Sequence, residues 1–151
     1  MRLKQLIFLL FIAFPGIYIQ AQPQLSKDQL AVQQAVVNLF MSLSEKDSVA
    51  LKAGCTTDVV FYEYGNAWNM DSLILKAVTL NRAPDFKRTN QFEFLNTTIK
   101  GKTAWTSYNL QSEVLQNGKR STINWSETII AVKEKKVWKV KVLHSTLIKR
   151  S

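Results

Sequence analysis

The sequence predicts an α+β domain in which about three N-terminal helices pack on one face of a strongly curved, mostly antiparallel sheet. Two observations lead to this prediction. Helical periodicity is confined to the first half of the chain, and the second half is a run of strand-like segments separated by short polar turns. Helices followed by an antiparallel meander are typical of domains with helices on one sheet face. Because a long meander has to curl to cover the helices, we expect it to enclose a cavity.

The first 21 residues have the pattern of a secretory signal peptide. Arg2 and Lys4 precede an apolar run over residues 6–14, Pro15-Gly16 interrupts it, and Ala21 offers a small residue for cleavage. The apolar run is shorter than the ~20 residues that a membrane-spanning helix needs. We therefore expect export to the periplasm or the extracellular space, with no membrane attachment after cleavage; the alternative is an uncleaved anchor. Residues 22–151 fit one domain.

The mature chain is predicted to begin with two helices. Ser26 and Gln29 form a capping box, in which a hydroxyl is followed three residues later by a glutamine. Apolar residues then recur at helical spacing up to about Glu45, at Val32, Val36, Leu39, Phe40 and Leu43. Asp47 or Ser48 can cap a short second helix that ends near Gly54.

A strand and a third helix complete the first half. Residues 58–64 are rich in β-branched and aromatic side chains and stop at Gly65-Asn66, which indicates a strand. Asn69 or Asp71 then begins a helix whose apolar side reaches Leu80.

The second half is predicted to be four strands over residues 91–99, 103–115, 120–132 and 137–148. Each boundary is a polar turn, and Asn117-Gly118 is a strong hairpin signal. No repeat, linker or low-complexity segment interrupts this pattern.

Basic residues outnumber acidic ones by 20 to 11, which gives a net charge of +9. They are scattered in short groups, such as Lys87-Arg88 and Lys119-Arg120, that fall at expected turns or chain ends. Lysines in such places keep sheet edges soluble, and no nucleic-acid-binding motif accompanies them. We therefore interpret the basic residues as surface and expect no nucleic-acid partner.

Several local patterns together resemble the nuclear transport factor two-like superfamily, and within it the SnoaL-like and calcium/calmodulin kinase association-type small domains. They are the capped first helix, the short second helix, the strand ending at Gly65, and a C-terminal signature consisting of Trp125-Ser126-Glu127-Thr128, Lys133, Trp138-Lys139 and Leu143-His144-Ser145-Thr146. The resemblance implies a cone of three helices wrapped by a bent sheet, a pocket at its wide end, and dimers through the outer sheet face. Its members include isomerases, cyclases, dehydratases and non-catalytic binding modules. The Asp-rich active site of the polyketide cyclases and ketosteroid isomerases is not recognisable.

His144 and Glu127 are the candidate catalytic residues. Strict alternation on the last strand places His144 on the same face as Trp138, Val140 and Val142, which we expect to be covered. Glu127 lies on the neighbouring strand, and a buried carboxylate is costly unless it is paired. A bond between Glu127 and His144 would make an acid–base pair; the same bond could equally be a structural tie.

Aromatic residues are the candidate ligand-binding residues, because Tyr and Trp combine apolar contact with a polar tip. They are Tyr62, Tyr64, Trp68, Tyr108 and Trp125. One histidine and one cysteine cannot form the usual zinc sites, and no glycine-rich phosphate loop or Gly-x-Ser-x-Gly motif is present. We therefore predict no metal and no cofactor. Cys55, alone in the chain, is expected to be a buried apolar residue.

These features leave three functions open. The first is an exported, dimeric pocket domain that binds a small apolar or aromatic molecule without catalysis. The second is an isomerase, dehydratase or cyclase that uses the His144/Glu127 pair. The third is an interaction module that acts through the outer sheet surface. The sequence does not decide whether the protein is an enzyme.

Overall fold

The computed structural model describes residues 24–151; the predicted signal peptide, residues 1–21, lies outside them. The helices are α1 (Lys27–Glu45), α2 (Ser48–Gly54), α3 (Met70–Leu73) and a π-helix, η1 (Ile74–Thr79), that continues α3. The strands are β1 (Cys55–Glu63), β2 (Asn66–Trp68), β3 (Lys87–Lys100), β4 (Thr103–Gln116), β5 (Lys119–Glu134) and β6 (Val137–Arg150). No helix in this part of the chain is long and apolar enough to cross a membrane.

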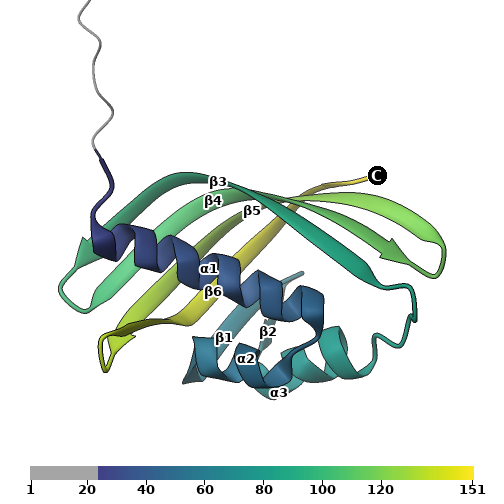
Figure 1. Cartoon of the computed structure of the whole chain (residues 1–151), viewed down its shortest axis with the longest axis horizontal. Coiled ribbons are helices and arrows are strands. Elements are labelled where there is room, and N and C mark those ends of the chain that lie inside the picture. Colours follow the sequence, from purple (N-terminus) through teal and green to yellow (C-terminus); the bar gives the residue numbers. More distant parts are fainter. Residues whose placement is uncertain (1–23) are drawn as a thin grey trace, which may run out of the picture.

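The strands form one sheet in the order β2-β1-β6-β5-β4-β3. All neighbours are antiparallel except β1 and β6, which run parallel. Figure 1 shows α1 lying along the concave side of the long strands β3–β6, with α2 and α3 close together near β1 and β2. The predicted architecture, helices on one face of a curved and mostly antiparallel sheet, is confirmed.

The helices begin where the capping residues predict. The Ser26 hydroxyl accepts a hydrogen bond from the Gln29 backbone N–H, and the Gln29 side chain accepts one from the Ser26 N–H. The Asp47 side chain caps α2 and the Asn69 side chain caps α3, each by accepting hydrogen bonds from backbone N–H groups of the first turn. The apolar stripe of α1 faces the sheet, since Val32 and Val36 are fully buried.

Three one-residue bulges interrupt the long strands. The register shifts by one residue at Leu95 in β3 and at Lys141 and Ile148 in β6. An extra residue in one strand bends it and increases its twist, so these bulges help to curl the sheet over α1. A bulge also reverses which side chains point inward beyond it, and this effect decides the placement of His144 below.

Two local features were not predicted. Tyr64 and Gly65 both have positive φ, 50° and 74°, which is the geometry of a tight two-residue hairpin turn. That turn lets residues 66–68 return as β2 beside β1. The third helix becomes a π-helix after Leu73, and Leu80, expected on its apolar side, is exposed.

Candidate functional site

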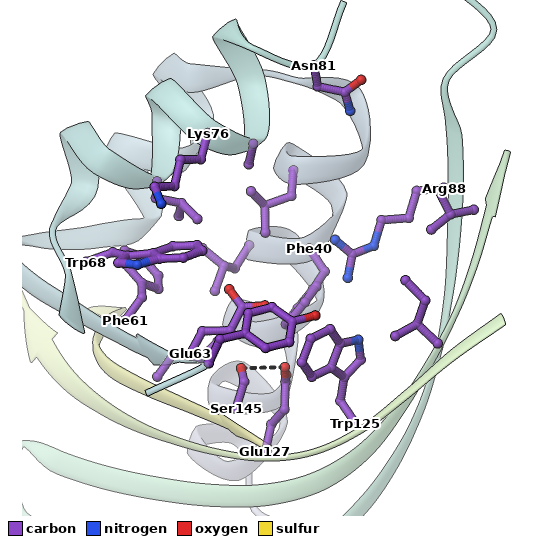
Figure 2. Close-up of a pocket in the computed structure, with 18 of the residues that line it drawn as sticks. Phe40, Phe61, Glu63, Trp68, Lys76, Asn81, Arg88, Trp125, Glu127 and Ser145 are labelled. Atoms are coloured by element: carbon purple, nitrogen blue, oxygen red, sulfur yellow. Dashed lines mark hydrogen bonds between the residues drawn. The ribbon is translucent and has the colours of Figure 1, made fainter. Parts of the chain in front are cut away.

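A cavity of about 290 Å³, partly open to solvent, lies between the concave sheet face and the helices (Figure 2). Its walls come from α1, η1, the loop before β3 and the inner sides of the strands. The aromatic lining residues are Phe40, Phe61, Tyr64, Trp68, Phe86 and Trp125. The charged ones are Glu63, Lys76, Arg88, Glu127 and Arg150. An apolar cavity with a few charged groups is the usual form of a small-molecule site.

Glu127 lies at the floor of this cavity on β5 and is only 4% exposed. The Ser145 hydroxyl on β6 donates a hydrogen bond of 2.7 Å to its Oε1 atom (Figure 2), whereas its Oε2 atom is buried without a hydrogen-bond partner. Burial raises the pKa of Glu127 to about 7, although Ser145, Tyr108 and the charge of Arg88 act in the opposite direction. Near neutral pH, both the charged and the neutral forms of this carboxyl group are therefore populated.

Tyr108 lies directly opposite Glu127 on β4 and is fully buried. Its ring packs against Phe40, Phe92 and Phe94. The hydroxyl group is close enough to Glu127 to lower the pKa of that carboxyl group, yet the geometry falls short of a hydrogen bond. The Tyr108 hydroxyl and the Glu127 carboxyl group thus face each other beneath the cavity without forming a hydrogen bond.

Arg88 extends from the start of β3 into the cavity (Figure 2). Its Nε atom donates to the Asn90 side-chain oxygen at 2.9 Å and one terminal nitrogen donates to the Ser112 hydroxyl at 3.0 Å. The guanidinium group also lies over the ring of Phe40, 5.1 Å from its centroid. Burial lowers the pKa of Arg88, while the charges of Glu127 and Glu63 act to raise it.

The turn between β1 and β2 contributes Tyr64 to the cavity wall. Tyr64 packs edge-on against Trp125, with ring centroids 5.5 Å apart, and its hydroxyl accepts a hydrogen bond from Arg150. Beside it, the amine of Lys76 lies 4.6 Å from the centre of the Trp68 ring. Aromatic and basic side chains thus line the cavity together.

No protein-family model matches the sequence, and no curated protein matches it at a significant level. Solved structures do share its architecture. The CamKII hub homology domain of Chlamydomonas reinhardtii is 18% identical, with a TM-score of 0.70 over 82% of this chain and 100% of that one. A ketosteroid isomerase-like protein from Erwinia carotovora atroseptica is 14% identical, with a TM-score of 0.68 over 83% and 99%. The hexachlorocyclohexane dehydrochlorinase LinA-type3 of Novosphingobium barchaimii is 11% identical, with a TM-score of 0.66 over 82% and 88%.

The chain has the nuclear transport factor two-like fold. The fold that the resemblance implied is therefore confirmed. At these identities the likeness extends to the fold alone, so the role of the cavity has to be argued from its own residues.

Within this nuclear transport factor two-like fold, His144 does not meet Glu127. The bulge at Lys141 shifts the phase of β6, so Leu143 and Ser145 point inward and His144 points outward. His144 is exposed and pairs in register with Tyr62 of β1, their rings 6.4 Å apart. The predicted covered position of His144 is wrong, and Ser145 takes the place beside Glu127.

The aromatic candidates divide into two groups. Tyr64, Trp68 and Trp125 line the cavity as predicted. Tyr62 is 44% exposed on the outer sheet face, and Tyr108 is packed in the core beneath the cavity floor; neither lines the cavity. Tyr62 precedes Glu63 on β1, and alternation turns Glu63 inward instead.

Several polar residues of the cavity were not predicted from the sequence, among them Glu63, Arg88 and Ser145. Glu63 carried a usable signal, because it alternates with the buried Phe61 on a predicted strand. Arg88 was interpreted as surface with the other basic residues; this is wrong, since β3 begins earlier than predicted and turns Arg88 inward. In the described part of the chain, no cluster of His, Cys, Asp and Glu side chains could hold a metal ion.

Proposed function

We propose that the protein binds a small aromatic or apolar molecule bearing a polar group in the cavity above Glu127. The Glu127 Oε2 atom carries this proposal. A buried acceptor left without a partner costs ~1–3 kcal/mol, and the residue that bears this unpaired atom lines an open, aromatic-walled cavity. A ligand that donates a hydrogen bond to Oε2 would remove this cost.

The size and lining of the cavity support the same proposal. Its volume of about 290 Å³ is at the lower end of small-molecule sites, which favours a ligand with a single ring. Trp68 and Trp125 on either side offer flat apolar surfaces for such a ring.

A thermal-shift screen with single-ring fragments tests this proposal. Binding to the native state raises Tm by mass action, so we expect a subset of fragments to stabilise the protein. Ala77→Trp on η1 would fill the cavity and should abolish these shifts, whereas Ala53→Trp, on an exposed part of α2 outside the cavity, should leave them intact. Fragments that stabilise the folded Ala77→Trp variant equally well would contradict binding in this cavity.

Proton transfer by Glu127 is the second candidate, favoured by its pKa of about 7. A base whose pKa is near the working pH is well suited to removing a proton from carbon. The likeness in fold to proteins named as an isomerase-like protein and a dehydrochlorinase adds a reason to test it. In this proposal Glu127 acts as base without His144, which lies on the other face.

Deuterium uptake by ketones with acidic C–H groups, followed by NMR in D₂O, measures such activity directly. We expect uptake to rise with pH through about 7, to disappear in Glu127→Gln and to persist in His144→Gln. Uptake that survives Glu127→Gln would exclude this role.

A further inference from the structure

The two walls of the cavity carry opposite charges that do not touch. None of the ion pairs in the described residues includes Arg88, Glu63 or Glu127. Figure 2 shows the guanidinium group of Arg88 on one side, with the carboxyl groups of Glu63 and Glu127 across the cavity from it. A ligand that fills this space can therefore meet a cation and a carboxyl group at once.

Arg88 is held in place by neutral partners. Its bonds to Asn90 and Ser112, and its position over Phe40, fix the guanidinium plane without neutralising its charge. The hydroxyl of Ser112 in turn donates to the same Asn90 oxygen, 2.8 Å away, which stiffens the arrangement. These contacts use one edge of the guanidinium group and leave its other N–H groups for a further acceptor.

The charges around the cavity favour an anion at this point. Lys76, Arg88 and Arg150 outnumber Glu63 and Glu127 among the lining residues, and burial raises the pKa of Glu127 to about 7, so part of its negative charge is lost near neutral pH. A carboxylate matches the planar, forked geometry of a guanidinium group and forms two parallel bonds with it.

We infer that the ligand is a small aromatic carboxylic acid whose carboxylate pairs with Arg88 and whose hydroxyl or amino group, at the other end of the ring, donates to Glu127. This inference rests on the proposed ligand-binding function and narrows it to one chemical class. The ring lies beside Trp125, which lines the cavity together with Arg88 and Glu127.

Calorimetric titration with matched acids and amides tests the inference. The probes are 4-hydroxybenzoate and benzoate, each with its neutral amide as partner. We expect 4-hydroxybenzoate to bind at least about tenfold more tightly than 4-hydroxybenzamide, because a carboxylate carries the opposite charge and forms two parallel bonds with arginine, whereas the neutral amide offers one acceptor. Benzoate, which lacks the donor for Glu127, should bind more weakly than 4-hydroxybenzoate.

Arg88→Gln should remove the preference for acid over amide, because it weakens acid binding much more than amide binding; a circular dichroism spectrum like that of the parent protein shows that the variant is folded. Arg88→Lys keeps the positive charge but lacks the planar, forked guanidinium group, so it should retain part of the preference for acid over amide. Arg82→Gln, an exposed residue outside the cavity, is the matched control and should behave as the parent protein does.

The outcomes separate this inference from the proposed function. Equal binding of acid and amide by the parent protein, or an unchanged preference in Arg88→Gln, overturns the anionic ligand while the cavity remains a ligand site. If no acid or amide binds while neutral fragments still stabilise the protein, the anionic ligand is likewise overturned. If no fragment, acid or amide binds, both the inference and the proposed function fail.

Discussion

At the scale of single residues, the environment of Glu127 has a consequence for stability. Burial raises the pKa of Glu127 from 4.5 to about 7. Between these two pH values, the folded protein therefore keeps a proton on Glu127 that the unfolded chain has already released. The contribution of Glu127 to the unfolding free energy is therefore largest below about pH 4.5 and is lost as pH rises from about 4.5 through 7. A shift of this size corresponds to about 3 kcal/mol.

Glu127→Gln should flatten this dependence, because the amide has the shape of the acid but does not ionise. We expect urea unfolding to show the variant more stable than the parent at about pH 8, and similar to it at about pH 5. Some slope will remain, because the pKa of Glu63 is also raised by burial.

Glu93→Gln is the matched control, since it makes the same change at an exposed position of the sheet. It should keep the pH dependence of the parent. A Glu127→Gln variant with an equally steep loss of stability between these pH values would contradict the raised pKa.

At the scale of elements, the bulge in β6 determines which chemical groups reach the cavity. Residues 138–142 alternate between Trp or Val and Lys, and this regular pattern conceals the extra residue at Lys141. No glycine or proline marks the position. The bulge arises because Ala131 pairs with Val140 while Ile130 pairs with Val142, a long-range arrangement that β6 alone does not encode.

Other elements were predictable because their signals are local. Ser26, Asp47 and Asn69 cap helices through their own side chains, and Asn117-Gly118 forms its hairpin turn within a few residues. Trp125 and Glu127 were predicted on the correct, inner face of β5 for a related reason, since β4 and β5 pair without a register shift. The parts of the site that were missed depend on register between strands rather than on local pattern.

Ser145→Ala and His144→Ala should therefore have unequal effects. The Ser145 hydroxyl lowers the pKa of Glu127 through its hydrogen bond, so its removal should raise that pKa further. His144→Ala changes only an exposed side chain and should leave the pKa of Glu127 unaltered. A carboxyl titration by NMR on ¹³C-glutamate-labelled protein measures both; an equal response of the two variants would refute this assignment of faces.

At the scale of the whole molecule, the outer sheet face carries an apolar row across four strands. Trp105 on β4, Ile130 on β5 and Val142 on β6 are neighbours in register, and Val60 on β1 follows Val142. Trp105 and Ile130 are 37% and 38% exposed. Exposed apolar surface of this kind marks interaction sites, and we propose that a second copy of the chain covers it.

Light scattering after size exclusion is expected to give the mass of a dimer. Ile130→Lys, which places a charge in the middle of the row, should shift the protein to monomer, whereas Asn124→Lys on the same face of β5 should not. A monomeric parent protein at high concentration would rule out this dimer.

The extra residue at Lys141 also bears on how such domains can diverge. If Lys141 were paired in the ladder instead of bulged out, unbroken alternation from Trp138 onward would turn the imidazole of His144 to the side where Glu127 lies. The place of the bulge therefore decides between a hydroxyl–carboxyl arrangement and a carboxyl–imidazole pair on the same scaffold. Lineages of this architecture can thus exchange one set of reactive groups for another by moving a bulge along β6.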